Sequence, residues 1–433
     1  MKLSGNVNND CNVLIFDEEN FELEYFGPVS TGSFSVNYLK NFNKSIVTDD
    51  SDGRSVGYGN VEVVDDTTNE YQNLEFVQGT LYTCGRNNYG QLGQNDLVSR
   101  SVLTKVGSNV NWTNVSCGSG HFIGLQSNGT IWGCGGNTSG QLGQNNRINY
   151  STPTRIGLSN MWRNIFTKGS SSYFLHDDYS LWACGNNGNG QLGLNDRLSR
   201  STVTKIGTST DWRKVACGAI YTIGIKSDGT MWSWGSNNNG VLGLGDTLGR
   251  STPTKIGTDT DWEIVSCSNY QNFALKTNGS LWVWGQNNNG QLGLGDLNNR
   301  STPTMLGIST DWKNVGGGGT EVLLVKGDRN ELWSFGSLSE NGSLGYPSSG
   351  NISSPTTALI VRNGWKKLCP GTSYLGLAIR HDNTMWSFGS NTHGQIGHGN
   401  LVSTSTPTKV GSYSNWYTAS GGYSFFAAIR TES

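Results

Sequence analysis

Short runs of alternating hydrophobic and polar residues, each ended by a glycine turn, recur along most of the chain. In one stretch the runs are "WRKVACG" (212–218), "YTIGIKSDG" (221–229), "TMWSWG" (230–235) and "STPTKIG" (251–257). Alternation with a period of two predicts β-strands, and none of these runs keeps a helical period over ten residues. The proline in the last run suits an edge strand, because proline cannot donate to a ladder. The pattern predicts four short antiparallel strands per unit.

Two independent markers repeat this unit with a period near 50 residues. The glycine that ends each third run recurs in steps of 50, 50, 50, 50, 51 and 53, at Gly85, Gly135, Gly185, Gly235, Gly285, Gly336 and Gly389. A tryptophan that begins each first run recurs at Trp112, Trp162, Trp212, Trp262, Trp312, Trp365 and Trp416. A repeated unit of four short strands is typical of a propeller blade. Seven copies of both markers predict an all-β, seven-bladed β-propeller.

The two ends of the repeat region are complementary fragments of one unit. The chain stops at "AIRTES" (428–433), where an inner copy continues into "NGSLWVWG" (278–285). The missing run occurs at the other end, as "QGTLYTCG" (78–85). We therefore expect strands from both ends to share one blade and close the ring, since closure leaves no open sheet edge.

The repeats also resemble a known family. "DWRKVACG" (211–218), "IKSDGTMWSWG" (225–235), "STPTKIG" (251–257) and "GQLGLGD" (290–296) are similar to the regulator of chromosome condensation repeat in its bacterial and phage form. The resemblance covers residues 78–433 and implies a seven-bladed propeller. It does not imply one function, because that family includes a nucleotide exchange factor, light sensors, secreted enzyme inhibitors and surface proteins.

The first part of the chain lacks both markers but still alternates as strands do. Around Gly27-Pro28, the stretches "VLIFD" (13–17) and "GSFSVNY" (32–38) resemble small transthyretin-like or carboxypeptidase-regulatory β-sandwich domains. We predict three segments, which are a small β-sandwich that acts as an anchor or spacer, a linker, and the propeller, at residues 1–66, 67–77 and 78–433.

Charge differs between the two parts of the chain. Residues 1–78 hold 14 acidic and 4 basic side chains, a net charge of −10, whereas the remaining 355 residues hold 18 acidic and 26 basic ones, a net charge of +8. Neither part has a basic tail, so composition gives no indication of nucleic-acid binding. The N-terminal residues do not contain the apolar segment of a signal peptide, so we expect no signal peptide. The sequence contains no run of about 18 apolar residues, so we expect no membrane insertion.

The glycine-dense loops have the composition of a phosphate-binding loop but not its context. Such a loop needs a strand, a glycine turn and then a helix whose N-terminal amides face the anion. The stretch "GQLGLGDLNNRSTPT" (290–304) leads instead into polar turn residues and an extended run, and similar loops recur in every unit. We interpret these glycines as turn residues that adopt positive φ at little cost.

Cysteine and histidine positions favour neither a disulfide nor a metal centre. Rotation between blades places equivalent cysteines too far apart to pair, as at Cys117, Cys217 and Cys267. The chain contains no C-x-x-C pair of the kind that holds zinc. No catalytic motif or recurring pair of carboxylates is visible, so we predict buried free thiols, no cofactor, no metal and no enzymatic activity.

Two sets of repeated positions are candidates for binding. The turn after the first run varies between units, as expected for a contact surface or for a turn that drifts freely, and its candidate partner-binding residues are His121, Tyr221, Tyr270, Gln271, Glu321 and Tyr374. An arginine after the glycine loop is constant in four units, at Arg100, Arg200, Arg250 and Arg300. These arginines either contact an anionic ligand such as a surface polysaccharide or stabilise the loop inside each blade, and repeated identity favours the second interpretation.

The leading hypothesis is a non-enzymatic binding or structural propeller. We expect it on a phage virion or an extracellular surface, reached without a signal peptide, where it contacts a host surface molecule or a neighbouring virion protein. The alternative is a soluble, cytoplasmic regulator or inhibitor that binds a partner protein across the propeller face. A second alternative is a propeller that binds or cleaves a polysaccharide. We expect no nucleic acid and no membrane insertion.

Overall fold

A computed structural model describes two compact units, which are treated separately. One unit consists mainly of residues 1–78 and the other mainly of residues 79–433. In the first unit the backbone is described over 2–7, 11–17, 23–29, 32–37, 44–50 and 55–60. In the second unit the described residues are 79–319, 321–336, 351–357, 364–369, 371 and 375–431.

The first unit contains six described strands in two antiparallel sheets. One sheet pairs β1 (Lys2–Val7) with β4 (Gly32–Asn37). The other has the order β3-β2-β5-β6 and consists of β2 (Cys11–Asp17), β3 (Leu23–Val29), β5 (Lys44–Asp50) and β6 (Ser55–Asn60). Strands therefore occur where alternation predicts them, whereas the packing of a β-sandwich stays a prediction. The predicted linker, residues 67–77, lies outside the described residues.

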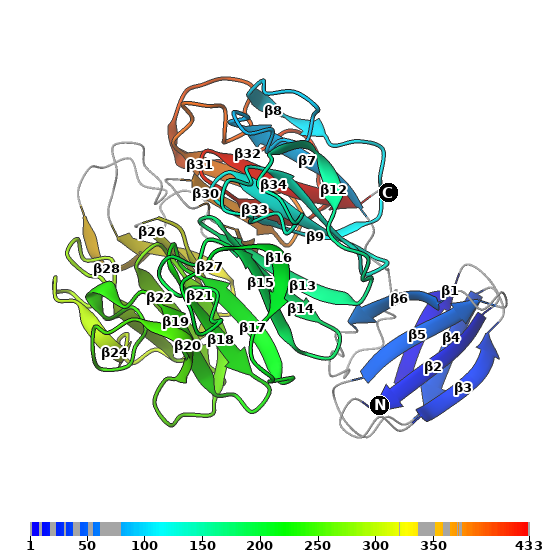
Figure 1. The fold of residues 1–433 in the computed structure, drawn as a ribbon, viewed down its shortest axis with the longest axis horizontal. Coiled ribbons are helices and arrows are strands. Elements are labelled where there is room, and N and C mark those ends of the chain that lie inside the picture. Colours follow the sequence, from blue (N-terminus) through cyan, green and yellow to red (C-terminus); the bar gives the residue numbers. More distant parts are fainter. Residues whose placement is uncertain are drawn as a thin grey trace. The chain divides into compact units, whose positions relative to one another are not determined.

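The second unit is a propeller of seven blades of four antiparallel strands each, which we number as blades 1 to 7 (Figure 1). Five blades are separate sheets, and blades 1 and 2 are joined into one eight-stranded sheet by the single Gly79–Trp112 pair. Blade 2 consists of β9 (Trp112–Cys117), β10 (His121–Gln126), β11 (Ile131–Gly135) and β12 (Tyr150–Arg155). Blade 3 consists of β13 (Trp162–Lys168), β14 (Ser171–His176), β15 (Leu181–Gly185) and β16 (Arg200–Lys205). Blade 4 consists of β17 (Trp212–Cys217), β18 (Tyr221–Lys226), β19 (Met231–Gly235), the short 3₁₀ helix η1 (Asn238–Gly240) and β20 (Arg250–Lys255).

The same order of strands continues through the next three blades. Blade 5 consists of β21 (Trp262–Cys267), β22 (Gln271–Lys276), β23 (Leu281–Gly285) and β24 (Arg300–Met305). Blade 6 consists of β25 (Trp312–Gly317), β26 (Glu321–Lys326), β27 (Glu331–Gly336) and β28 (Ile352–Thr357). Blade 7 consists of β29 (Trp365–Leu368), β30 (Leu375–Arg380), β31 (Met385–Gly389) and β32 (Thr404–Lys409).

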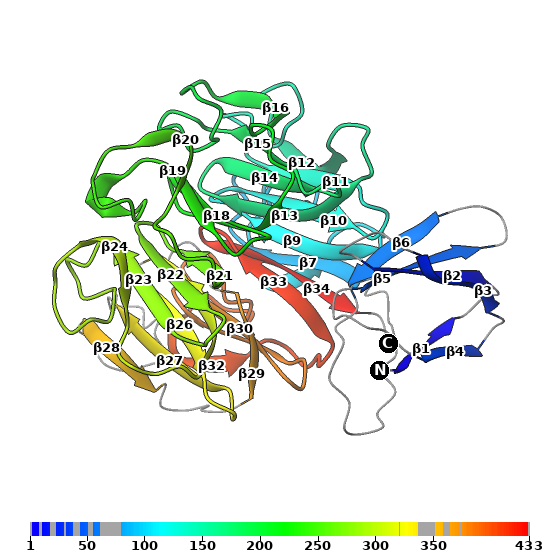
Figure 2. The ribbon, with the colours of Figure 1, turned by 90° about the horizontal axis from the view of Figure 1, so that it is seen from below.

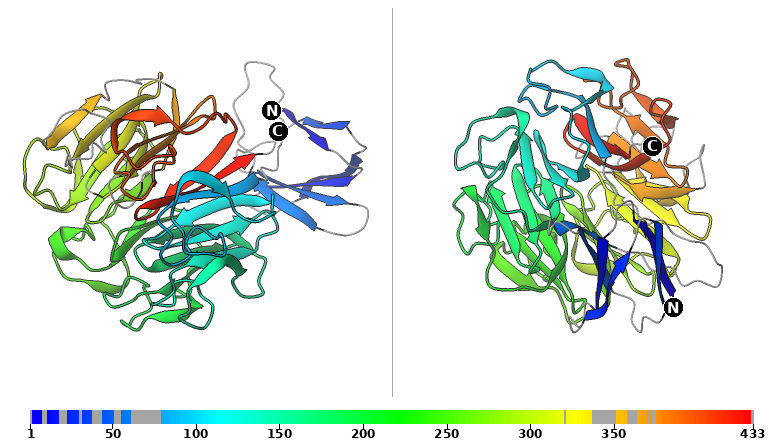
Figure 3. Two further views of the ribbon diagram at one scale, coloured as in Figure 1. Left: turned by 90° about the horizontal axis from the view of Figure 1, so that it is seen from above. Right: turned by 90° about the vertical axis from the view of Figure 1, so that its right-hand side faces the viewer.

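Blade 1 is built from both ends of the propeller segment, as predicted. Its first two strands are β33 (Trp416–Gly421) and β34 (Phe425–Thr431), and its outer two are β7 (Gly79–Gly85) and β8 (Arg100–Lys105). The β34–β7 ladder runs without a break from the Phe425–Gly85 pair to the Thr431–Gly79 pair. Figures 2 and 3 show β7, in light blue, beside β34, in red.

The first strand of each blade lies nearest the propeller axis. Strand β9 contacts β13, β13 contacts β17, and β17 contacts β21, so the first strands of neighbouring blades pack against one another. The fourth strand is the outer edge, and it contains Pro153, Pro253 and Pro303. This position agrees with the expectation that the proline-containing run is an edge strand.

Strand register defines two edges of the propeller. In blade 2, His121 at the start of the second strand lies opposite Gly135 at the end of the third, and Gly135 lies opposite Tyr150 at the start of the fourth. One edge, which we call the loop edge, therefore carries the turns between first and second strands and the long loops between third and fourth strands. The opposite edge, the turn edge, carries the turns between second and third strands and the connections between blades.

The hydrophobic core lies between consecutive blades. One cluster joins Tyr173 and Leu175 of blade 3 to Trp212 and Trp234 of blade 4. The repeated tryptophan that begins each first strand is buried throughout, with exposed fractions of 1–8 %. Full burial of a large apolar side chain contributes about 1.5–3 kcal/mol. The seven repeated tryptophans are therefore a large part of what holds neighbouring blades together.

A lysine held between two indoles recurs at the turn edge. In blade 5, Lys276 Nζ lies 4.9 Å from the ring centroids of both Trp262 and Trp282, and 2.8 Å and 3.0 Å from the carboxylates of Asp259 and Asp261. Blades 4 and 6 repeat the arrangement with Lys226–Asp211 and Lys326–Asp311. Such contacts contribute about 0.5–2 kcal/mol each.

The lysine and its acidic partner change together within the chain. Blades 4, 5 and 6 place aspartate directly before the marker tryptophan, whereas blade 2 has Gln126 with Asn111 and blade 3 has His176 with Met161. His176 instead pairs with Asp178 on its own turn, with 2.9 Å between Nδ1 and Oδ1. The repeats thus keep a polar side chain at the position between the indoles, but its residue type changes from blade to blade.

Replacing Phe426 by alanine tests whether β34 closes the ring. Phe426 is fully buried and packs in one cluster with Cys84 and Leu377. We expect Phe426→Ala to lower the free energy of unfolding by about 3–5 kcal/mol, as for other buried phenylalanines. The matched control is Tyr423→Ala, just before β34 and 47 % exposed, which we expect to change stability by no more than about 0.5 kcal/mol. Urea unfolding followed by tryptophan fluorescence measures both, and equal effects of the two substitutions would contradict ring closure.

Candidate functional site

One buried asparagine organises each of the six long loops that the structure describes at the loop edge. In blade 3, Asn187 is fully buried, and its Oδ1 accepts the Leu192 N–H at 2.9 Å. Its Nδ2 donates to the backbone carbonyl of Asp196 at 3.1 Å and to the Asp196 carboxylate at 2.9 Å. The same contacts recur at Asn87, Asn137, Asn237, Asn287 and Asn391. The loops are therefore rigid parts of the fold.

The repeated arginines bind carboxylates inside their own loops. The donor–acceptor distances are 2.5–2.6 Å in the pairs Arg100–Asp96, Arg200–Asp196, Arg250–Asp246 and Arg300–Asp296. The hydrogen bond from Arg100 is the largest cause that lowers the pKa of Asp96 to about 2. In blade 2, Asn146 and the Tyr150 hydroxyl form a neutral version of this pair at 2.9 Å. These contacts agree with the loop-stabilising interpretation, and an external anion would compete with the aspartate for each guanidinium.

Each of these six described loops also bonds to the outer strand of the next blade. The Asn195 N–H of blade 3 donates to the Ser251 carbonyl of blade 4 at 2.9 Å, and the Gly295 N–H of blade 5 donates to Ser353 of blade 6 at 2.8 Å. Gly290, with φ +75°, fits only because it has no side chain, since a Cβ there would lie 2.7 Å from the Ser353 Cβ. The interpretation of these glycines as turn residues is confirmed, and the turns serve close contact between blades.

Three of the predicted contact residues are buried, so the expectation that they project from an exposed turn is wrong. His121 is 0 % exposed, and Tyr221 and Gln271 are each 1 % exposed. His121 Nε2 lies 2.9 Å from Ser172 Oγ in the next blade, and the Tyr221 hydroxyl donates to the Gln271 carbonyl at 3.0 Å. Burial lowers the pKa of His121 to about 3, so it is neutral. These residues begin the second strand, because the turn before it is tight, and they face the neighbouring blade.

The other predicted contact residues have different positions. Tyr270 lies on the turn itself and is 37 % exposed at the loop edge. Glu321 begins β26, but its side chain lies outside the described residues, as does Tyr374 altogether. Of the predicted contact side chains that the structure describes, Tyr270 is therefore the one available to a partner, and its binding role stays a prediction.

Aliphatic side chains at the loop tips are the candidate site that the sequence analysis missed. Each of the six described long loops exposes at least one large aliphatic residue between its Asp or Asn and the start of the outer strand. Their exposed fractions are 59–70 %, and they are Leu97, Val98, Ile148, Leu198, Leu248, Leu297, Leu401 and Val402. Tyr89 and Tyr423 are exposed at the same edge, at 45 % and 47 %. An aliphatic residue inside an otherwise polar loop, as in "DTLGR" (246–250), was the signal available in the sequence.

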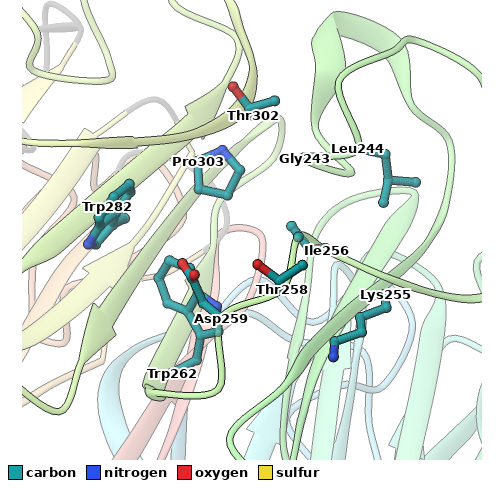
Figure 4. A pocket seen from close by; sticks show the side chains of 11 residues that line it. Gly243, Leu244, Lys255, Ile256, Thr258, Asp259, Trp262, Trp282, Thr302 and Pro303 are labelled. Carbon is teal, nitrogen blue, oxygen red and sulfur yellow. The ribbon is translucent and has the colours of Figure 1, made fainter.

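A groove between blades 4 and 5 has a volume of about 340 Å³ (Figure 4). Its walls include Trp262, Trp282 and Pro303, with Lys255 and Asp259 as charged groups. Asp259 already binds Lys276 at 2.8 Å, so its carboxylate is engaged in the scaffold. The groove is therefore a product of blade packing, formed by positions that recur at other blade junctions.

The described part of the chain was searched for metal-ligand clusters and for reactive cysteines. No group of three His, Cys, Asp or Glu side chains is arranged to hold a metal ion among the described residues. The seven cysteines in the propeller unit are free and buried, in agreement with the predicted thiols. Burial raises the pKa of Cys117 to about 12, so this thiol stays protonated at neutral pH. Within the described residues no helix has the length and apolar character needed to cross a bilayer.

Comparisons with known proteins agree with this architecture. The model of the regulator of chromosome condensation (RCC1) repeat matches residues 78–125, 128–167, 179–225, 228–275, 278–325 and 382–429, and a second RCC1 repeat model matches 112–141, 212–241 and 263–291. No sequence among the curated proteins matches the chain.

Solved propellers are similar to the chain in fold. Human WBSCR16 is 21 % identical, with a TM-score of 0.72, over 82 % of this chain and 100 % of that one. Prp20p from Saccharomyces cerevisiae is 19 % identical, with a TM-score of 0.75, over 82 % and 92 %. Yeast RCC1 (Prp20) bound to Kap60 is 17 % identical, with a TM-score of 0.74, over 87 % and 97 %.

The asparagine and arginine contacts of one loop are expected to differ in energy. Asn187→Ala leaves the buried Leu192 N–H without its acceptor, and we expect a loss of about 1–3 kcal/mol in unfolding free energy. Arg200→Ala removes a partly exposed ion pair, and we expect a loss of no more than about 1 kcal/mol. Urea unfolding of both variants provides the comparison. A larger loss for Arg200→Ala than for Asn187→Ala would mean that the arginine, and not the asparagine, organises the loop.

Proposed function

The chain belongs to the RCC1 repeat family, and on this basis we propose that it is a non-enzymatic propeller that binds a protein partner through its loop edge. The observation that carries the proposal is the set of exposed aliphatic loop tips, repeated around the described part of the propeller. Contiguous apolar surface is typical of interaction sites, and we propose that a partner which spans neighbouring blades buries several of these tips at once.

The loops are suited to binding because their conformation is already determined. Buried asparagines hold the loop backbone, and hydrogen bonds to the next blade fix each loop relative to its neighbour. Binding of a partner therefore costs little conformational entropy in these loops, because they are already ordered. Exposed tyrosines at the same edge, Tyr89, Tyr270 and Tyr423, add the residue type that is enriched among binding hot spots.

Relatives with the same fold give independent support for protein partners. Yeast Prp20p is described with its binding to Gsp1p and histones, and it has been solved bound to Kap60. Because Prp20p is only 17–19 % identical to this chain, these partners are stated for Prp20p alone. What we propose for the present chain is the general role of protein binding, with a partner selected by its own loop tips.

We propose that the chain has no enzymatic activity, because of the side chains that lie at the propeller axis. The first strands of blades 1 to 5, which lie nearest the axis, line a cavity of about 190 Å³, which we call the axial cavity. Its described side chains are serine, threonine, cysteine, lysine and apolar residues, without a carboxylate pair. Paired carboxylates are the usual acid and base groups of a polysaccharide-cleaving enzyme. This composition favours the binding alternatives over a polysaccharide-cleaving propeller.

A role on a phage virion or an extracellular surface is the more specific form of the proposal. It rests on the low charge and high glycine content of the chain and on a separate N-terminal unit that would act as an anchor. Mass spectrometry of purified virions or surface fractions from the native source tests it. Detection only in the cytoplasmic fraction would instead favour a soluble regulator or inhibitor.

Charge introduced at two loop tips provides the test of the binding edge. A tagged full-length chain carrying Leu198→Asp and Leu248→Asp is expected to bind its purified partner at least about tenfold more weakly than the unmodified chain, because a buried carboxylate at an interface is costly. The partner is first recovered in stoichiometric amount with the unmodified chain, and binding is then measured by calorimetry.

The matched control for this test lies on the opposite edge. Ile308 is 94 % exposed on the connection between blades 5 and 6, so Ile308→Asp makes the same chemical change at the turn edge. We expect Ile308→Asp to leave partner affinity unchanged. Loss of binding with Ile308→Asp, together with full binding by the double variant, would place the interface on the turn edge and overturn the proposal.

A further inference from the structure

The cation that lies beside the aromatic rings of a blade has a carboxylate partner in blades 4, 5 and 6, but not in blade 1. In these blades one residue of the second strand lies opposite the marker tryptophan, as Lys276 does opposite Trp262. An aspartate directly before that tryptophan binds the lysine, with N–O distances of 3.1, 3.0 and 3.6 Å. In blade 1 the equivalent pair is Arg430 opposite Trp416, and the residue before the tryptophan is Asn415. Blade 1 therefore keeps the cation and lacks the acid.

Two tyrosine rings form the immediate surroundings of Arg430 at the turn edge. Its guanidinium carbon lies 3.8 Å from the ring centroid of Tyr413 and 5.0 Å from that of Tyr82. Tyr413 is 49 % exposed, so this side of the site is at the protein surface. The ring faces attract the positive charge. They do not replace the oxygen acceptors that the five N–H groups of a guanidinium can bind.

The nitrogen atoms of Arg430 have no acceptor among the described residues. Nε and Nη1 are buried and make no hydrogen bond. Nη2 makes none either but is not among the buried atoms, so it is the nitrogen that a ligand can reach. Asn415 does not replace the missing aspartate, because its side-chain amide donates to the Thr431 carbonyl. A cation that is partly removed from water without a partner is unfavourable, and a bound anion would relieve this cost.

The blades on either side of blade 1 do not supply the missing acid. At the hairpin of the turn edge, blade 7 has Asp382, whose carboxylate accepts the Thr384 N–H at 3.0 Å and the Thr384 hydroxyl at 2.6 Å. The corresponding residue of blade 2 is Asn128, which carries no charge. Within the described ranges, no carboxylate forms an ion pair with Arg430.

We propose that Arg430 binds the carboxylate of an external ligand at the turn edge of blade 1, between Tyr82 and Tyr413. A carboxylate is the anion that the same position receives from the chain itself in blades 4, 5 and 6, and hydrogen bonds between a guanidinium and a carboxylate are strong. Because Arg430 pairs with Thr80 in the β34–β7 ladder, a bound ligand stabilises the blade that closes the ring. The site lies at the edge opposite the loop tips, so it does not depend on the proposed protein partner.

A blocked glutamate is the probe for this site in the full-length chain. N-acetylglutamate α-amide carries one carboxylate, and N-acetylglutamine α-amide is the uncharged control of the same shape. With ionic strength held constant by chloride, we expect a saturable rise in Tm with the first compound and none with the second. A short glycine-serine peptide with one central glutamate distinguishes the two sources of the carboxylate. Tighter binding of the peptide would indicate an acidic side chain of a protein, and equal or weaker binding would indicate a small molecule.

Substitutions in blade 1 locate the binding of the probe. Arg430→Met is expected to raise the half-saturating concentration at least about fivefold, whereas Arg430→Lys keeps it within a few-fold, because the charge is retained. Asn415→Asp gives blade 1 the acid that blades 4, 5 and 6 have, and we expect it to abolish the response to the probe. This variant carries the test if Arg430→Met does not fold. The matched control is Lys313→Met, which removes an exposed lysine of β25 in blade 6 and is expected to leave the response unchanged.

Several results would each overturn the proposal. They are the absence of a saturable response, equal responses to the glutamate and glutamine compounds, and a response that persists in both Arg430→Met and Asn415→Asp. Glu432 follows Arg430 by two positions and lies outside the described residues. A response that appears only in the Glu432→Gln variant would mean that an acid of the chain itself occupies Arg430, which would also overturn the proposal.

Discussion

The propeller depends on the antiparallel ladder between β34 and β7. Every other blade is a continuous segment of chain, but blade 1 exists only because Phe425–Thr431 pairs along its whole length with Gly79–Gly85. Without that ladder the ring would expose two unpaired sheet edges and would lose the inter-blade cluster around Phe426. The loop contacts between neighbouring blades, from the Asn195 N–H to Ser251 and its equivalents, then hold the closed ring at its outer rim.

Much of this fold was accessible from the sequence because its signals are periodic. The glycine and tryptophan markers recur at positions that backbone geometry and core packing require in every blade, as at Gly290 beside Ser353 and Trp212 beside Tyr173. Ring closure followed from complementary fragments at the two ends. The role of the repeated arginines was also accessible from the sequence. Arg200 and its equivalents occupy the same loop position, and each forms an ion pair with the aspartate four residues earlier, as Arg200 does with Asp196.

The candidate site was harder to predict, because it depends on register and on contacts between blades. One residue separates an exposed turn from a strand that faces the next blade, which is why Tyr270 is exposed while Gln271 is buried. The lysine between two indoles escaped notice because blades 2 and 3 place Gln126 and His176 there, so no constant residue marks the position.

The propeller combines a constant scaffold with variable surfaces. Buried asparagines, glycine turns and marker tryptophans repeat nearly unchanged, whereas the loop tips and the ends of the first strands differ from blade to blade. A rigid ring allows such differences without loss of stability, because each variable side chain is carried by a loop or strand that is already ordered. Function in this chain is therefore expected to depend on which blades carry each exposed or axial side chain.

Hydrogen exchange measured by mass spectrometry shows whether both ends of the propeller segment close the ring. We expect the amides of the β34–β7 ladder, such as those of Ala428 and Tyr82, to be protected to within about tenfold of the amides in the β22–β23 ladder of blade 5, because both ladders lie inside complete four-stranded blades. Exchange of the β34 and β7 amides at the rate of an unfolded chain, while blade 5 stays protected, would contradict it.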